Sequence, residues 1–239
     1  TINCPSFSNT FRLPYLNNVQ ILESLFEHCQ DWRDTKNMTT ARIRDQYHHG
    51  DLEVALISTA RKFVKKNGLE SLSLRQIAQE IGVSPSAAYH YFPDRNSLLA
   101  ALGFSLFEEL ADYQDRALSK VSGKSAKAAR DRFRTLGRTY FEWAIGEPHF
   151  FNLMFSDFCL IESSLEQERE KNRAYQTLIR CLDDLVETGS MNKQLRGSAE
   201  LLSWSVVHGT TSLIVSGHLE RDDFEKALDG LDLALGIRK

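Results

Sequence analysis

Apolar residues recur at every third or fourth position along most of the chain after residue 50. This spacing predicts amphipathic helices, and no stretch alternates apolar and polar residues as a half-buried strand does. A first helix is expected over 51–66, with Gly68 just beyond its end. The later helices are expected over 94–119, 124–146, 148–155, 161–188, 198–219 and 222–237. The pattern therefore predicts an all-α protein, with a small helical head followed by a larger helical bundle.

Between residues 72 and 99 the pattern predicts two short helices joined by a tight turn. Ser73 and Gln76 have the spacing of a capping box, in which each side chain bonds to the other residue's backbone N–H. Ile77, with the alanine after it, continues as a buried stripe. Gly82 follows the first short helix and suits the left-handed backbone position that ends many helices.

The second short helix has equally local start and stop signals. Ser84 is an N-cap residue, and Pro85 fits the first helical position, where a backbone N–H is not needed. Ala88 and Phe92 are four residues apart and are expected to pack inward. Pro93 ends the helix. The surface left over is small or aromatic and polar, as in a helix that enters a DNA groove: Ser86, Ala87, Tyr89, His90 and Tyr91.

The run from residue 50 to 99 resembles the DNA-binding domain of the TetR family of bacterial transcriptional regulators. The resemblance rests on three linked segments, NGLESLSLRQIAQEIGV, SPSAAYHYF and PDRNSLL. The lysine that the family usually has early in the next helix is Arg95 here, which keeps the positive charge. The resemblance implies a helix-turn-helix head that binds double-stranded DNA.

Several residues of the head suit contacts with DNA. Arg75 lies in the first turn of its helix, where a cation opposes the helix dipole, so a phosphate or a guanine edge would explain it. A solvated surface arginine is the alternative. Ser86 and Ala87 are small enough for close approach to the bases, and Ala87 can touch a thymine methyl group. The full set of predicted DNA contacts is Thr39, Arg42, Arg44, Ser73, Arg75, Ser84, Ser86, Ala87, Tyr89, His90, Tyr91 and Arg95.

The bundle carries an aromatic-rich set of side chains that could line a pocket for a small apolar or aromatic molecule. The predicted ligand contacts are Tyr140, Trp143, Phe150, Phe151, Met154, Phe155, Trp204 and His208. The alternative for each of them is a plain core position, because aromatics at helical spacing usually belong to the core. His208 can bond either a ligand or a buried carbonyl.

Two segments of the bundle also resemble the family's regulatory domain. EPHFFNLMF is similar to a segment common in that domain. SWSVVHGTTSLIVSGHL resembles a C-terminal subtype marked by a Trp, a His and a Gly, here Trp204, His208 and Gly209. The resemblance implies that the last two helices pair with their copies across a two-fold axis.

Charge and length refine this division of the chain. The 239 residues carry a net charge of −3, so there is no global basic signal. Residues 38–100 hold eight Lys or Arg against six Asp or Glu, whereas 101–239 is acidic, as expected if one end faces phosphates. We predict a DNA-binding head over 38–100 and a regulatory and dimerisation domain over 101–239.

Residues 1–37 fall outside this pattern, and Met38 followed by polar residues is typical of a natural start. We interpret 1–37 as an extension from outside the family pattern, either disordered or left over from cloning. An arm that docks on the body or on DNA is the alternative.

Motifs of other function classes are missing or incomplete in the sequence. Gly123-Lys124-Ser125 resembles the end of a P-loop, but Leu118 stands where its first glycine belongs. The four cysteines have no metal-binding spacing and no disulfide framework. No apolar run reaches the length of a membrane span. We therefore expect no enzyme, no cofactor and no metal, and a location in the bacterial cytoplasm on the nucleoid.

Together these patterns predict a ligand-responsive regulator. The resemblance implies a homodimer that binds a palindromic operator, most often as a repressor. It also implies that a small apolar or aromatic effector releases this homodimer from DNA. The alternative is a ligand-independent architectural or cell-cycle factor whose body binds a protein partner. An empty aromatic pocket would favour the first, and a filled core with an exposed apolar patch the second.

Overall fold

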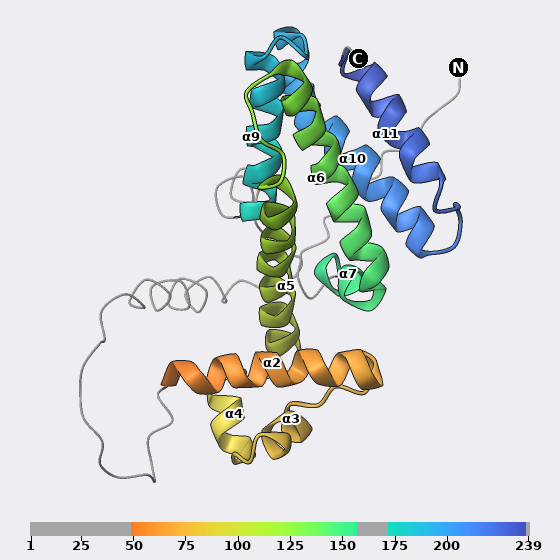
Figure 1. Ribbon diagram of the computed structural model, residues 1–239. Coiled ribbons are helices and arrows are strands. Elements are labelled where there is room, and N and C mark those ends of the chain that lie inside the picture. The colour runs from red at the N-terminus through yellow and green to blue at the C-terminus, as the bar shows by residue number, and fades with distance from the viewer. Residues whose placement is uncertain (1–48, 157–171, 238–239) are drawn as a thin grey trace, which may run out of the picture. The chain divides into compact units, whose positions relative to one another are not determined.

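The computed structural model describes residues 49–156 and 172–237, all of which belong to one compact unit, residues 47–239. Every regular element in these two stretches is a helix, which confirms the all-α prediction (Figure 1). None of the helices described is both long and apolar enough to cross a membrane. The predicted extension 1–37 and the residues Thr39, Arg42 and Arg44 lie outside the described residues.

Three helices form the head: α2 (His49–Asn67), α3 (Leu74–Glu80) and α4 (Pro85–Tyr91). Helix α3 packs against both α2 and α4. Their inward residues are almost completely buried, including Leu56 on α2, Ile77 on α3 and Ala88 on α4. In Figure 1, α2 runs across the lower end of α5, and α3 and α4 lie on the far side of α2 from the bundle.

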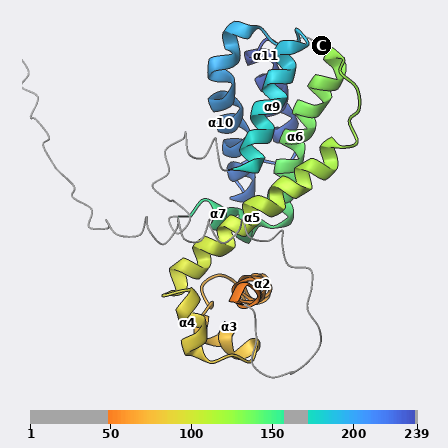
Figure 2. The same cartoon turned by 90° about the vertical axis from the view of Figure 1, so that its left-hand side faces the viewer.

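Helix α5 (Arg95–Leu118) runs from the head into the bundle (Figure 2). Asp94 caps its start in a capping box with Ser97, so this end is well defined. Leu98, Leu102, Leu106 and Leu110 follow one another at four-residue spacing and are all buried. Because this row is apolar along its length, α5 packs against α2 at one end and against the bundle helices beyond.

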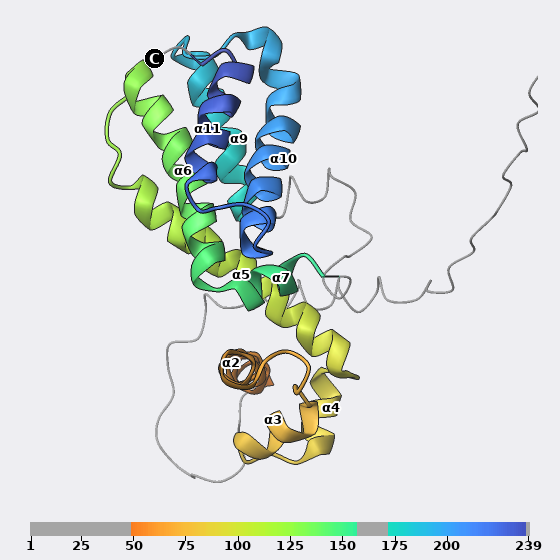
Figure 3. The ribbon, with the colours of Figure 1, turned by 90° about the vertical axis from the view of Figure 1, so that its right-hand side faces the viewer.

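The bundle follows α5 in the chain. Its elements are α6 (Ala126–Gly146), α7 (Pro148–Met154), α9 (Arg173–Glu187), the short 3-10 turn η2 (Lys193–Leu195), α10 (Arg196–Val215) and α11 (Asp223–Ala234). Helix α6 packs against α9, α10 and α11, and Figure 3 shows these four helices side by side. Helix α7 packs against α5 and α6.

Two apolar cores hold these helices together. One runs from the head along α5 to the aromatic side chains of α6 and α7, so it crosses the predicted boundary at residue 100. The other fills the bundle between α6, α9, α10 and α11. A shared core gives the head and the bundle a direct packing connection. The domain boundary itself stays a prediction.

The helix bounds mostly agree with the sequence pattern, with three differences. The helix expected over 222–237 ends at Ala234. The helix expected over 198–219 ends at Val215, because Ser216 ends the regular hydrogen bonding and Gly217 has a positive φ of 76°. The turn η2 was not predicted. For the helix expected over 161–188, the part before residue 172 lies outside the described residues.

Candidate functional site

The turn between α3 and α4 has the geometry that the sequence predicts. Gly82 has a φ of +75°, a region where side chains bring strain. The N–H of Val83 donates to the carbonyl of Ala78 (3.0 Å), which closes the end of α3. The glycine thus sets the angle at which α4 leaves the turn.

Helix α4 is fixed at its start by local chemistry. The Ser84 Oγ accepts a hydrogen bond from the Ala87 N–H (3.2 Å), and Pro85 occupies the first helical position. Ala88 and Phe92 point into the core. These three predictions are confirmed, and they orient the opposite face of α4 outward.

The outward face of α4 is the one predicted to meet DNA. Ser86, Tyr89 and His90 are exposed, Tyr89 by 49%. Ala87 and Tyr91 are instead half-buried and pack against the head core. Burial, and to a lesser extent the charge of Glu53, raises the pKa of Tyr91, so its hydroxyl keeps its proton near pH 7.

The start of α3 differs from its prediction. Ser73 occupies the N-cap position, but its side chain makes no capping hydrogen bond, so the predicted capping box with Gln76 is wrong. Arg75 and Gln76 are exposed at this end. Their backbone N–H groups can bond to water there, so the helix end needs no side-chain cap.

Arg95 has a structural contact that the sequence did not indicate. Its Nε donates to the carbonyl of Leu72 (3.0 Å) and its Nη2 to the carbonyl of Leu69 (2.7 Å). The guanidinium thus ties the start of α5 to the segment between α2 and α3. Contact with a DNA phosphate stays a prediction for this residue.

A cavity of about 50 Å³ lies in the bundle, lined by residues of α5, α6, α9, α10 and α11. Two of the predicted ligand contacts line it, Tyr140 on α6 and Trp204 on α10. Apolar side chains such as Phe107, Leu136 and Val207 make most of the remaining wall. The structure therefore brings only part of the predicted aromatic set to one hollow.

The other predicted aromatic contacts divide into two groups. Trp143, Phe150, Phe151 and Met154 are buried in the core that runs along α5, as the core alternative expected. Phe155 and His208 lie beside the cavity instead. The Phe155 ring is 5.8 Å from that of Trp204 and 4.4 Å from that of His208.

His208 lies within this aromatic cluster, where its ring contacts two aromatic rings and one ring nitrogen makes a hydrogen bond. Its Nδ1 lies 2.8 Å from the Tyr140 hydroxyl, and its ring stacks on Trp204 at 5.5 Å. Burial lowers the pKa of His208, so the neutral imidazole is favoured. The sequence predicted a buried carbonyl or a ligand as the partner of His208. The partner found at its Nδ1 is instead a tyrosine hydroxyl.

Two polar atoms in the cavity wall have no hydrogen-bond partner among the described residues. They are Oε1 of Gln114 on α5 and Oγ of Ser203 on α10. Gln114 is 3% exposed and Ser203 is 2% exposed. Neither residue was predicted from the sequence, although Gln114 continues the row of Leu98 to Leu110 at the same spacing.

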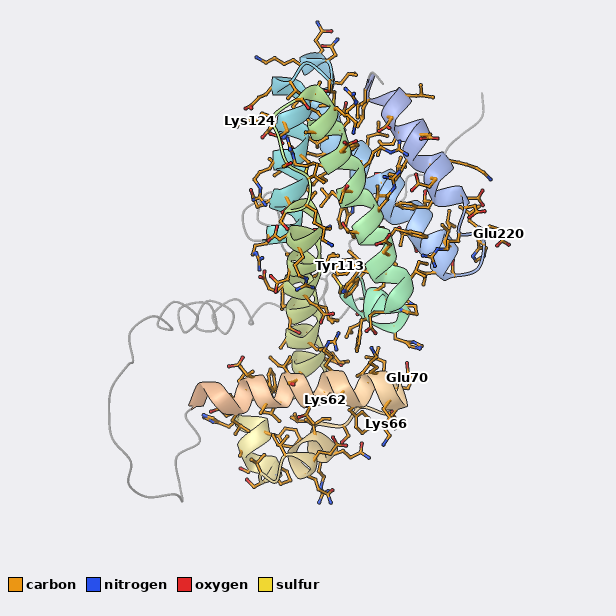
Figure 4. The ribbon with its side chains drawn as sticks, viewed as in Figure 1. Lys62, Lys66, Glu70, Tyr113, Lys124 and Glu220 are labelled. Carbon is orange, nitrogen blue, oxygen red and sulfur yellow. The ribbon has the colours of Figure 1, made fainter. Side chains whose placement is uncertain are left out.

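A small polar cluster links the head to the bundle beside α5. Arg61 on α2 donates to Glu109 on α5 (2.7 Å), which also accepts from the Trp143 indole N–H (3.3 Å). The Arg61 guanidinium lies over the Phe150 ring, 5.0 Å from its centroid. Farther along α5, the Tyr113 hydroxyl donates to Glu142 on α6 (3.4 Å), and Figure 4 labels Tyr113 there.

Two family descriptions match successive parts of this chain. "Bacterial regulatory proteins, tetR family" matches residues 56–102, which hold the helix-turn-helix. "Tetracyclin repressor-like, C-terminal domain" matches residues 133–234, which hold most of the bundle. The chain belongs to the TetR family. The resemblance predicted from the head is therefore confirmed.

Two curated relatives match this chain over less than half of their length. An HTH-type transcriptional regulator of Mycobacterium bovis is 30% identical over 104 residues, which are 44% of this chain and 43% of that protein. The HTH-type transcriptional regulator BetI of Rhizobium meliloti is 33% identical over 87 residues, 36% of this chain and 40% of that one. The chain thus spans less than half the length of these relatives.

Solved structures share the TetR-type fold over most of their length. A protein of unknown function from Rhodococcus sp. RHA1 aligns with a TM-score of 0.64 and 26% identity, over 81% of this chain and all of that one. A TetR-family transcriptional regulator from Pectobacterium atrosepticum aligns with a TM-score of 0.62 and 22% identity, over 82% and 99%.

Proposed function

We propose that this TetR-family chain is a ligand-responsive transcriptional repressor, which binds a palindromic operator as a homodimer and is released by a small molecule held in the bundle. The observation that carries the proposal is the position of α5. The same helix packs against α2 of the head and lines the cavity with Leu110 and Gln114. A change in the cavity can therefore move the head. Such a role would place the protein on the nucleoid in the bacterial cytoplasm.

The exposed face of α4 supports DNA binding. Ser86 leaves room for the helix to approach the bases, and Tyr89 and His90 can donate to phosphates or bases on either side. Arg75 adds a positive charge at the exposed start of α3. A helix this short meets only a few base pairs, so one head alone gives little specificity.

The exposed side of α10 supports pairing with a second copy. Leu201, Ser205, Gly209 and Leu213 follow one another at four-residue spacing, so they share one face, and Leu201 is 66% exposed. A glycine inside a helix lowers its stability by roughly 0.5–1 kcal/mol relative to alanine. A Cβ on Gly209 would meet no atom of the described chain within 4 Å. Close approach of a helix from the second copy would account for the glycine.

Release from DNA then follows from geometry. Two heads bind successive half-sites only if they lie about 34–36 Å apart, one turn of DNA. A ligand that favours a different position of α5 alters this spacing, so both half-sites can no longer be met. A coupling free energy of about 1–3 kcal/mol is typical and changes affinity roughly 5- to 150-fold.

The DNA-binding part is tested by selecting genomic fragments on the full chain and measuring affinity for the enriched fragment. We expect Tyr91→Ala and Arg95→Ala to weaken binding to every sequence, because these residues position the head. We expect Arg75→Ala and Ala87→Ser to change the sequence preference, because Arg75 is exposed at the start of α3 and the half-buried Ala87 keeps part of its surface open on α4. Unchanged binding in all four variants would contradict the assignment of the head.

The homodimer is tested by sedimentation equilibrium at micromolar concentration. We expect Leu213→Glu to dissociate the dimer, because a charge would be buried against the second copy. Val54→Glu is the matched control, since Val54 is a similarly exposed apolar residue on α2. A monomeric wild-type chain, or equal dissociation in both variants, would argue against pairing through α10.

The cavity also bears on the alternative of a ligand-independent factor with a protein-binding body. Such a factor needs no hollow in its bundle, and a filled core would be more stable. The presence of a cavity with unpartnered polar atoms favours the ligand-responsive regulator.

A further inference from the structure

We propose that the cavity takes a small neutral molecule with an apolar body and one hydroxyl or N–H group, which Gln114 and Ser203 recognise. The inference rests on the proposed function for the existence of an effector, and it adds the chemical class of that effector. It is carried by four properties of the cavity, namely its size, its apolar wall, its lack of charge and its two unpartnered polar atoms.

The size of the cavity limits the occupant. A single water needs at least about 10–15 Å³ of such space. The 50 Å³ found here holds a few waters as it stands, and because a cavity of about 150 Å³ binds benzene, a single small ring enters only if the wall moves apart. Large or branched effectors do not fit without displacement of the surrounding helices.

The wall of the cavity selects against charge. None of the described residues that line it is Asp, Glu, Lys, Arg or His. A buried ion without a partner is strongly disfavoured, so an anionic or cationic molecule would lose its hydration without compensation. A neutral molecule with an apolar body is the one that matches this lining.

Several polar side chains in the wall are already hydrogen-bonded, and two polar atoms remain for the occupant to bind. Tyr140 is paired with His208, the Tyr175 hydroxyl donates to Glu200, and the Asn172 Oδ1 accepts the Tyr175 N–H. Oε1 of Gln114 and Oγ of Ser203 have no such partner. A buried polar atom without a hydrogen bond is disfavoured, so a bound donor that satisfies Gln114 would be held selectively.

The two atoms come from helices on different sides of the hollow. Gln114 is on α5 and Ser203 is on α10, and α6 and α9 each pack against both of these helices. A hydroxyl that donates to Gln114 therefore acts directly on the helix that carries the head. The contact that selects the ligand would therefore also couple ligand binding to the position of the DNA-binding head.

Phenol and toluene are matched probes, because they share a ring and differ only by a hydroxyl in place of a methyl group. Their affinities for the full-length wild-type chain are measured by calorimetry without DNA. We expect the ratio of phenol to toluene affinity to fall at least about tenfold in Gln114→Leu, because the phenol hydroxyl loses its acceptor. Ser203→Ala should lower the ratio in the same direction.

Thr211→Val is the matched control. The Thr211 Oγ1 is also buried without a partner among the described residues, but it does not line the cavity, so the ratio should stay unchanged. Benzoate, a charged ring of similar size, should not bind at pH 7.

An unchanged ratio in both Gln114→Leu and Ser203→Ala would overturn the inference, as would benzoate binding as tight as that of phenol. Failure of both neutral probes to bind the wild type at millimolar concentration would overturn it as well. The measurement uses no DNA, so it can fail while the operator is still bound, or succeed while DNA binding fails.

Discussion

At the scale of single residues, a polar side chain of the predicted DNA surface can hold the backbone in place as well as face solvent. Arg95 is the clearest case, because its guanidinium donates to two carbonyls that precede α3. Arg75, in contrast, is exposed at the start of α3. Arg75 and Arg95 were both predicted to contact DNA, but they therefore differ in what their loss would do.

We expect Arg95→Ala to lower the free energy of unfolding by about 1–3 kcal/mol, because two part-buried carbonyls lose a charged donor. Arg75→Ala should change stability by less than about 0.5 kcal/mol, as is usual for exposed positions. Urea denaturation of both variants measures the difference. Equal stability of the two would show that the contacts of Arg95 do not hold the head together.

His208 predicts a pH dependence of stability. Burial lowers its pKa in the folded protein, whereas the unfolded imidazole has its ordinary pKa of about 6.5. The unfolded chain therefore binds more protons on acidification, and the folded state loses stability as the pH falls through and below 6.5. His208→Gln should remove this part of the loss between pH 7.5 and 5.5 in urea titrations. An identical loss in the variant would contradict the assignment.

The residues that sequence could predict are those with local signals. Gly82 and Ser84 depend only on backbone conformation and neighbouring N–H groups, and both have their predicted roles. The sequence could not show that Gln114 and Ser203 line the same cavity, because their position depends on which helices meet across the bundle. For the same reason, spacing alone could not tell that Phe150 is core while Trp204 lines the cavity.

At the scale of elements, the geometry of the head depends on the turn between α3 and α4. The backbone of Gly82 is left-handed, while the end of α3 and the start of α4 are fixed by hydrogen bonds. The sequence predicted these helices well because caps and glycines mark their ends. It predicted α10 less well, since that helix is apolar on several faces and lacks a clear stop before Gly217.

We expect Gly82→Ala to destabilise the protein by about 1 kcal/mol, because alanine is strained at this φ. Gly146→Ala is the matched control at the end of α6. Neither added Cβ meets an atom of the described chain within 4 Å, so only backbone conformation differs. The control should be neutral or stabilising by up to about 1 kcal/mol. If chemical denaturation shows that the free energy of unfolding changes in the same direction in both variants, this explanation is contradicted.

At the scale of the molecule, the cluster of Arg61, Glu109 and Trp143 joins three helices of the head and bundle. Together with the core along α5, it supplies the physical connection between cavity and DNA surface. This connection was not visible in the sequence, because its members are separated by tens of residues. It carries the proposed coupling between ligand and DNA.

We expect Glu109→Gln to reduce the effect of phenol on operator affinity severalfold, while phenol and operator each still bind. The neutral amide weakens the pair with Arg61, so the head follows α5 less closely. Lys127→Gln is the control, because among the described residues Lys127 pairs only with Asp131, on the exposed surface of α6. Fluorescence anisotropy with labelled operator measures the coupling. The same phenol effect in wild type and Glu109→Gln would exclude this route.

In the proposed complex, two copies of this chain present two α4 helices to one palindromic DNA site. Footprinting of the full-length protein on the genomic fragment that it selects most strongly tests this arrangement. We expect two protected half-sites related by a two-fold axis, with centres about 10 base pairs apart or a multiple of one turn. No enriched fragment, or protection of a single unpaired half-site, would contradict it.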